Sequence, residues 1–203
     1  MIHGFLKACT VSPALRVADC AFNTQQTIAA MQRAAADGVQ LAVFPELGLT
    51  GYTCGDLFFQ QPLQRAAARG LAAVLEASAD LDLVALVGLP VTVDGKLYNC
   101  AAVVCHGKLL GLVPKTYLPN YGEFYERRQF NPAPAGVRTL HFAGQEVPFG
   151  TQLLFRCVEM PEFCLGVEVC EDLWAPLPPS THHALAGATV IANLSASDET
   201  IGK

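Results

Sequence analysis

The chain of 203 residues is 52% hydrophobic and 15% charged, a composition that is typical of one packed globular domain and excludes an intrinsically disordered protein. Its formal net charge of -5 gives no reason to expect nucleic acid or an anionic membrane as a partner. The sequence has no apolar run long enough to span a bilayer and no secretory signal pattern at its N-terminus, so we expect a cytoplasmic protein.

The first quarter of the chain predicts a strand, a helix and a second strand. Residues 4–11 alternate as a strand, Asn23 is the expected N-cap of a helix that ends at Gly38, and residues 41–44 form a short, wholly apolar strand. Such a strand is typical of a sheet that is buried on both faces. A strand–helix–strand unit places its two strands parallel in one sheet with a right-handed connection.

The middle of the chain alternates between apolar segments and turn signals. We expect a second helix at residues 60–78, a strand at 83–89 that ends at Pro90, a tight hairpin turn at Asp94-Gly95, and strands at 100–105 and 109–113. A long irregular segment rich in tyrosine and phenylalanine follows at residues 116–136. Loops of this length inside a compact domain are usually functional.

The last third of the chain predicts short elements. We expect strands at residues 139–142, 152–158 and 163–170, a helix at 181–186, and a strand at 189–193. A final strand and loop normally lead into another crossover helix, and the 203 residues have no polar tail. We therefore expect this chain to be a piece of a longer one, truncated at its C-terminus.

Three chemically active side chains stand at the ends of three predicted strands. Glu46 follows the strand at residues 41–44, Lys115 follows the strand at 109–113, and Cys170 ends the strand at 163–170. Each has an ordinary explanation when taken singly: an exposed glutamate, a solvated lysine and a buried cysteine. If the three strands are neighbours in one sheet, the three groups converge in the crevice outside their carboxyl ends.

Together, the three groups form a complete set for acyl transfer. A thiol needs a base to become a nucleophile, and a carboxylate in a desolvated pocket can be that base. The five histidines lie outside the strand-end pattern. The ammonium of Lys115 and the backbone N–H of Glu171 can stabilise the oxyanion that forms on attack. No pair of the eight cysteines has CxxC spacing, so we expect no metal site.

The stretches around these strand ends resemble the nitrilase, or carbon–nitrogen hydrolase, superfamily. The resemblance rests on residues 42–47 (AVFPEL), 114–119 (PKTYLP) and 166–172 (GVEVCED). It implies an α/β fold of four layers, an αββα sandwich, that carries a Glu-Lys-Cys triad.

A narrower resemblance is to the glutaminase domains of bacterial glutamine-dependent NAD⁺ synthetases. It rests on residues 49–52 (LTGY), 120–130 (NYGEFYERRQF) and 192–197 (ANLSAS), and it covers essentially the whole chain. Residues 1–203 are therefore expected to form one carbon–nitrogen hydrolase domain. The resemblance implies that Glu46 is the general base, that Lys115 stabilises the tetrahedral intermediate and that Cys170 forms the γ-glutamyl thioester.

The same resemblance implies three residues that hold glutamine: Tyr121, Ser197 and Lys203. The family has an arginine at the last position, and a lysine cannot make the planar bidentate contact that an arginine makes with a carboxylate.

The resemblance also implies a second glutamate near the triad, for which we choose Glu126 over Glu123. The alternative for Glu126 is an ion pair with Arg127 or Arg128.

By the resemblance, this domain itself needs no cofactor and binds glutamine. The ammonia would travel to a separate synthetase domain, which uses ATP and Mg²⁺ to convert deamido-NAD⁺ to NAD⁺. The SGGxDS motif of that domain does not occur in these residues. Members of the superfamily assemble through their sandwiches, so the resemblance also implies a homo-oligomer. Two alternatives stay open, a stand-alone nitrilase-type amidase that acts on another amide or nitrile, and an inactive truncated fragment.

Overall fold

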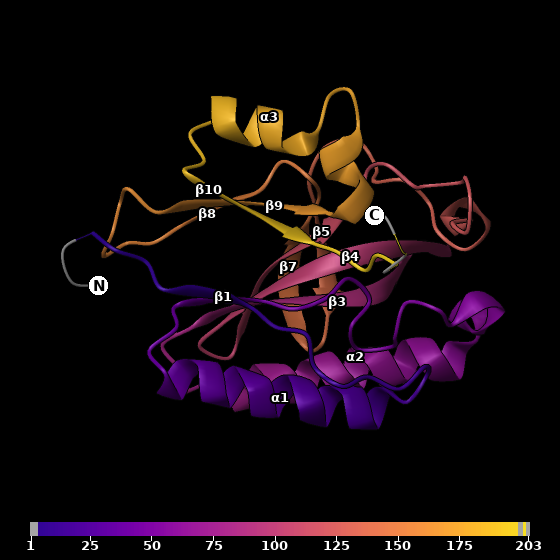
Figure 1. Cartoon of the computed structure of the whole chain (residues 1–203), viewed down its shortest axis with the longest axis horizontal. Helices are drawn as coiled ribbons and strands as arrows, with labels where there is room; N and C mark the ends of the chain where they lie inside the picture. The colour runs from indigo at the N-terminus through magenta and orange to yellow at the C-terminus, as the bar shows by residue number, and fades with distance from the viewer. Residues whose placement is uncertain (1–3, 199–200, 202–203) are drawn as a thin grey trace.

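The computed structural model describes residues 4–198 and 201, which fold into four layers (Figure 1). Helices α1 (Cys20–Ala36) and α2 (Gln61–Ala77) cover one face of a seven-stranded sheet. The other face of this sheet packs against a three-stranded sheet, whose outer face carries α3 (Pro179–Leu185). The order of layers is helix, sheet, sheet, helix, which confirms the predicted αββα sandwich.

The large sheet has the strand order β1-β2-β3-β4-β5-β7-β6. The first three strands are parallel, β3, β4 and β5 form an antiparallel meander, β5 runs parallel to β7, and β7 is antiparallel to β6. Their bounds are β1 Ala8–Thr10, β2 Leu41–Val43, β3 Val84–Val93, β4 Lys96–Cys105, β5 Lys108–Pro114, β6 Arg138–Phe142 and β7 Gln145–Phe149.

The small sheet has the strand order β10-β9-β8, with bounds β8 Leu154–Arg156, β9 Cys164–Val169 and β10 Val190–Leu194. Strand β9 is parallel to β10 and antiparallel to β8. Its residues alternate between the two sides of the sheet, so that Val167 and Val169 enter the core between the sheets while Glu168 faces α3.

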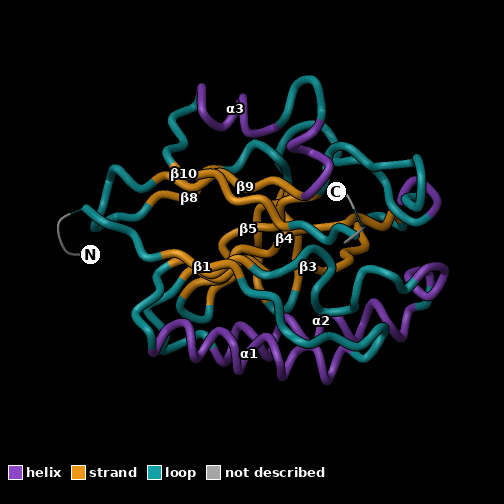
Figure 2. Tube along the Cα trace, viewed as in Figure 1, coloured by secondary structure: helices purple, strands orange, loops and turns teal. Residues whose placement is uncertain are grey.

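The condition under which we expected the three groups to converge, that their strands are neighbours in one sheet, is not met. Strands β2 and β5 belong to the large sheet, separated by β3 and β4, whereas β9 belongs to the small sheet. Figure 2 shows β9 with β8 and β10 in a layer apart from β3, β4 and β5. Convergence at one end of the molecule results instead from the face-to-face packing of the two sheets, which bury Leu86, Val113 and Val167 in one shared core.

Several predicted boundaries also differ from the structure. Helix α1 begins at Cys20, because the side chain of Asp19 accepts a hydrogen bond from the Phe22 N–H, and Asn23 is a buried residue inside the helix. Its predicted end is confirmed, since Gly38 follows the C-cap in the left-handed conformation.

Strand β3 continues through Pro90 to Val93. Strand β2 pairs with β3 only as far as Leu86, so beyond that point β3 has a ladder partner on one side, and the missing N–H of Pro90 leaves no bond unmade there. Strand β7 was not predicted, because its sequence QEVPF is short, polar and contains a proline.

Three short 3₁₀ segments complete the described elements: η1 (Gly55–Phe59), η2 (Glu126–Arg128) and η3 (Cys170–Trp174). The second lies in the long irregular segment that follows β5. None of the helices in the described part of the chain has both the length and the apolarity required to cross a membrane.

Candidate active site

Glu46 lies in the turn that leaves β2, and this turn packs directly on the backbone of β3. A Cβ atom on Gly88 would come within 2.4 Å of both the Pro45 carbonyl oxygen and the Leu47 nitrogen. Only glycine fits this close approach. The Leu49 N–H also donates to the Gly88 carbonyl at 3.1 Å. The middle of the large sheet therefore fixes where the Glu46 carboxylate points.

Lys115 follows directly after β5, and its side chain is fully buried. The ammonium Nζ donates to Glu46 Oε1 at 2.7 Å and to Glu126 Oε1 at 2.7 Å. Burial alone would lower the pKa of Lys115, but the two carboxylates outweigh it and raise that pKa. Lys115 is therefore a positive charge whose side chain has no exposed surface and is held by two carboxylates.

The Glu46 carboxylate is held from three directions. Besides the Lys115 ammonium, Asn99 Nδ2 donates to Oε1 at 2.6 Å and the Ala196 N–H donates to Oε2 at 3.0 Å. Burial raises the pKa of Glu46, Lys115 opposes this rise, and Glu126 adds to it. A buried carboxylate whose pKa is raised is a stronger base than an exposed one.

Cys170 is the first residue of η3 and adopts a left-handed backbone conformation with φ of 47°. Its Sγ lies 4.0 Å from the carbonyl oxygen of Ala196, the residue whose N–H donates to the Glu46 carboxylate. Burial and the charge of Glu46 raise the pKa of the thiol to about 11, although Lys115 opposes them. At neutral pH, the resting thiol of Cys170 is therefore protonated.

The structure places Glu126, not Glu123, beside the lysine. Glu126 is buried, and its Oε1 also accepts a hydrogen bond of 2.7 Å from the Tyr52 hydroxyl. The alternative of an ion pair with a neighbouring arginine is wrong for Arg128, which binds Asp56 through two 2.8 Å contacts. Burial and the Glu126 carboxylate raise the pKa of Tyr52, which therefore remains a hydrogen-bond donor.

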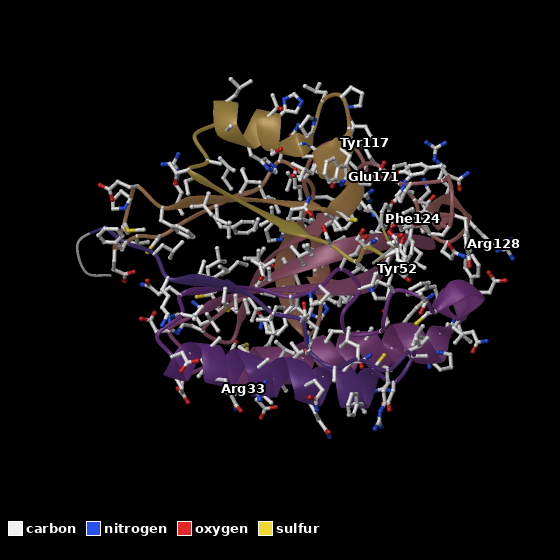
Figure 3. The ribbon with its side chains drawn as sticks, in the orientation of Figure 1. Arg33, Tyr52, Tyr117, Phe124, Arg128 and Glu171 are labelled. Atoms are coloured by element: carbon white, nitrogen blue, oxygen red, sulfur yellow. The ribbon has the colours of Figure 1, made fainter. Side chains whose placement is uncertain are left out.

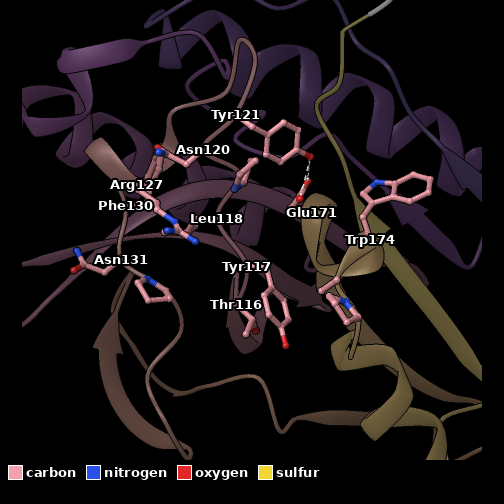
Figure 4. Close-up of a pocket in the computed structure, with 14 residues that line it drawn as sticks. Thr116, Tyr117, Leu118, Asn120, Tyr121, Arg127, Phe130, Asn131, Glu171 and Trp174 are labelled. Atoms are coloured by element: carbon pink, nitrogen blue, oxygen red, sulfur yellow. Dashed lines mark hydrogen bonds between the residues drawn. The ribbon is translucent and has the colours of Figure 1, made fainter.

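Of the predicted substrate residues, Tyr121 lines a cleft of about 710 Å³, whose wall also includes Thr116 and Glu171, the chain neighbours of Lys115 and Cys170 (Figure 4). Tyr121 is exposed, and its hydroxyl donates to the Glu171 carboxylate at 2.8 Å, which raises the pKa of the tyrosine. Arg127 and Trp174 line other parts of the cleft. Glu46, Lys115 and Cys170 are not among the residues that line it.

Ser197 and Lys203 belong to the segment after β10. Ser197 directly follows Ala196, the residue that contacts both Glu46 and Cys170, so it borders the site. Lys203 lies outside the described residues.

Sequence reasoning missed polar residues that support the triad. Asn99 binds Glu46 through its side chain and the Lys115 N–H through its carbonyl oxygen, at 2.8 Å. Asp172 accepts hydrogen bonds from the N–H groups of Thr116, Tyr117 and Val169, so it joins the segment after Lys115 to the segment before Cys170. Burial raises the pKa of Asp172 to about 7 against these three donors.

One sequence signal for such residues exists. Asn99 interrupts an otherwise apolar run in β4, and a buried polar residue in such a run must find a partner.

Figure 3 shows Tyr52, Phe124 and Glu171, which come from distant segments, gathered at the same end of the sandwich.

The described residues contain no group of three or more histidine, cysteine, aspartate or glutamate side chains placed to hold a metal ion. What the residues do form is a cluster of one partly buried thiol, two buried carboxylates and one buried ammonium. Such a cluster can move a proton from sulfur to oxygen and can stabilise negative charge on a substrate oxygen.

Comparison with known proteins gives matches along nearly the whole chain. The family model described as carbon–nitrogen hydrolase matches residues 8–202. The glutamine-dependent NAD(+) synthetase of Mycobacterium tuberculosis is 44% identical over 201 residues, which are 99% of this chain and 30% of that protein. The chain thus spans about a third of the length of these curated relatives.

Two solved structures place the fold. A glutamine-dependent NAD(+) synthetase from Cytophaga hutchinsonii superposes with a TM-score of 0.85 at 28% identity, covering 98% of this chain and 32% of that one. An amidase from Nesterenkonia sp. superposes with a TM-score of 0.69 at 23% identity, covering 98% of this chain and 68% of that one. The second likeness is one of fold alone.

Proposed function

The chain belongs to the carbon–nitrogen hydrolase family, and from that premise we propose that it hydrolyses the side-chain amide of glutamine to glutamate and ammonia through a thioester on Cys170. The observation that carries the proposal is the meeting of the Cys170 thiol, the Glu46 carboxylate and the Lys115 ammonium in one buried cluster, although they come from two sheets. The names of the similar NAD(+) synthetases, which are called glutamine-dependent, support glutamine as the substrate.

The proposed reaction begins with a proton transfer. Glu46 accepts the thiol proton while sulfur attacks the amide carbon, which forms the carbon–sulfur bond and places a negative charge on the carbonyl oxygen. Lys115 and the backbone N–H of Glu171 stabilise this oxyanion. Glu46 then gives the proton to the leaving nitrogen as the carbon–nitrogen bond breaks, and ammonia departs. Water, activated by Glu46, hydrolyses the thioester and releases glutamate.

Other residues have supporting parts in the proposal. Glu126 keeps Lys115 in place and charged, since the two are in direct contact at 2.7 Å. Tyr121, Ser197 and Lys203 hold the glutamine, in a cleft that needs no metal or cofactor for this half of the reaction. Glu171 contributes its backbone N–H to the oxyanion and accepts a hydrogen bond from Tyr121 through its side chain.

For the longer protein, we propose that the ammonia is consumed by a separate domain. The relatives are about three times as long as this chain and are named as glutamine-dependent NAD(+) synthetases. A synthetase domain of that kind would use ATP and Mg²⁺ to amidate deamido-NAD⁺ to NAD⁺. We further propose a cytoplasmic homo-oligomer, as the resemblance implies.

The test is glutamine hydrolysis by the full-length protein, with both glutamate and ammonia measured. Cys170→Ala should abolish turnover and should also abolish trapping by a diazo-ketone analogue of glutamine. Cys157→Ala is the matched control, because Cys157 lies in a separate cavity next to Glu159 and should not affect the rate. A Cys170→Ala variant with the wild-type rate would exclude the mechanism. Turnover of simple amides or nitriles in place of glutamine would favour a stand-alone amidase.

A further inference from the structure

Cys170 has backbone strain that something in the structure must hold. A residue other than glycine in the left-handed region costs on the order of 1–3 kcal/mol and persists only where its surroundings fix it. Strand β9 ends at Val169, so the N–H and the C=O of Cys170 lie beyond the ladder between β9 and β10. The turn that carries the nucleophile therefore needs partners for both groups.

One side chain supplies both partners. The N–H of Cys170 donates to Asn193 Oδ1 at 3.1 Å, and Asn193 Nδ2 donates to the Cys170 carbonyl oxygen at 3.2 Å. The Ser195 hydroxyl donates to the same Oδ1 at 2.6 Å, and Nδ2 also donates to Glu168 Oε1 at 3.3 Å. These four bonds use both acceptor positions and both donor positions of the amide.

Glu168 determines which way the Asn193 amide points. The two residues are register partners on β9 and β10, so their side chains lie next to each other on the outer face of the small sheet. Glu168 is fully buried, and its other oxygen accepts from the Ser180 N–H at 2.9 Å, in the first turn of α3. A flipped amide would place Oδ1 against the carboxylate, so only the observed orientation is satisfied.

We propose that Asn193 and Glu168 are positioning residues for the reaction at Cys170. The bond from Asn193 Nδ2 to the Cys170 carbonyl fixes the peptide plane between Cys170 and Glu171. Because this plane is rigid, the same bond sets the direction of the Glu171 N–H, which is the backbone oxyanion donor. Glu168 acts one step further away, by orienting Asn193. This inference rests on the proposed function.

In the full-length protein, Asn193→Asp removes the amide donor of Asn193. A second variant, which exchanges the acid and the amide between positions 168 and 193, keeps the charge unchanged and so distinguishes a loss of stability from a loss of positioning. In Asn193→Asp, two carboxylates face each other and the thermal midpoint should fall. In the double variant Glu168→Gln/Asn193→Asp, the new glutamine can donate to residue 193 and accept from the Ser180 N–H, so the midpoint should recover. The Cys170 carbonyl still lacks its donor in this variant.

For the double variant we therefore expect kcat with glutamine to fall by about tenfold or more, with KM within about threefold of the wild type. The neutral variant Asn193→Ala should lose at least as much kcat without adding charge. Gln25→Glu, an exposed change of amide to acid on α1, is the control and should alter neither the midpoint nor kcat.

A second reaction keeps this inference separate from the choice of substrate. Acylation of Cys170 by p-nitrophenyl acetate forms a thioester and releases p-nitrophenolate, and it should fall in the same variants. If the wild type acylates but does not hydrolyse glutamine, the proposed substrate fails and the inference is judged on acylation alone. Wild-type kcat or acylation in either variant, a loss confined to KM, or a swap that does not recover the midpoint would each overturn it. If the wild type undergoes neither reaction, both proposals fail.

Discussion

The Lys115 ammonium and the Glu46 carboxylate form an ion pair of 2.7 Å in which neither side chain has any exposed surface. The two residues are 69 positions apart in the chain, and a second carboxylate, that of Glu126, completes the pair on the other side of the ammonium. Two buried carboxylates thus share one ammonium, and the charge balance of the cluster depends on Lys115.

Lys115→Met should destabilise the protein strongly. It leaves two buried carboxylates without a counter-ion, and removal of one partner from a buried pair typically costs about 3–5 kcal/mol of unfolding free energy. Urea unfolding at pH 7 measures the loss, and the loss should shrink as the pH is lowered and the carboxylates become protonated. Lys96→Met, at the exposed start of β4, is the control. A loss below about 1 kcal/mol, as for a surface pair, would contradict the assignment.

Glu126→Gln should lower kcat for glutamine by about tenfold or more, because it removes one of the two carboxylates that hold the Lys115 ammonium. Glu123→Gln, which alters an exposed side chain three residues earlier, should leave kcat unchanged. Steady-state kinetics on the two variants provides the comparison. Equal losses, or a larger loss in the second variant, would show that the choice between the two glutamates is wrong.

Glu46→Gln should change thiol reactivity and catalysis in opposite directions. The Glu46 charge helps to raise the pKa of Cys170 to about 11, whereas Lys115 lowers it. Without that charge the thiol pKa falls, so at pH 8.5 more thiolate is present and iodoacetamide should alkylate Cys170 faster. Glutamine hydrolysis should nevertheless be lost, because the base is gone.

Mass spectrometry of the alkylated peptides measures the rate at Cys170, with Cys157 as the reference thiol in the same sample. Slower alkylation of Cys170 in Glu46→Gln would show that the carboxylate does not raise the pKa of the thiol.

Gly88→Ala should displace the Glu46 carboxylate, although it leaves the Glu46 side chain itself unchanged. The new Cβ would meet the backbone on both sides of Glu46 at 2.4 Å, so the turn must move away from β3. We expect a loss of about 1–3 kcal/mol in stability together with a reduced kcat. Gly144→Ala, at a left-handed position with open space around it, should cost stability through its backbone conformation but leave kcat intact. Wild-type kcat in a folded Gly88→Ala variant would refute this role.

Local patterns predicted those parts of the fold that depend on few neighbours. The hairpin at Asp94-Gly95 forms as expected, since both residues adopt the left-handed conformation that such a turn requires. Glu46, Lys115 and Cys170 could be selected as candidates because each stands at the end of a short apolar strand, and the structure brings them to the same end of the molecule. Pro90 shows the limit of this reasoning, because a proline interrupts a strand only where both edges are paired.

The supporting residues could not be predicted, because their roles depend on contacts between distant parts of the chain. Asn99 meets Glu46 across 53 residues and Ala196 meets it across 150. Asn193 stands in an ordinary strand, and only its register with Glu168 brings it to Cys170. Membership of one sheet or the other is likewise set by packing, and the local sequence left open whether β9 shares a sheet with β2 and β5.

The division of the cluster between two sheets also orders events during biosynthesis. The large sheet is complete at Phe149, so Glu46 and Lys115 leave the ribosome well before Cys170 and the Ala196 N–H that binds the Glu46 carboxylate. A nascent chain therefore contains Glu46 and Lys115 before it contains the nucleophile, Cys170. On the proposed mechanism, ammonia release starts only after the small sheet has closed on the large one, so chains that do not yet include Cys170 consume no glutamine.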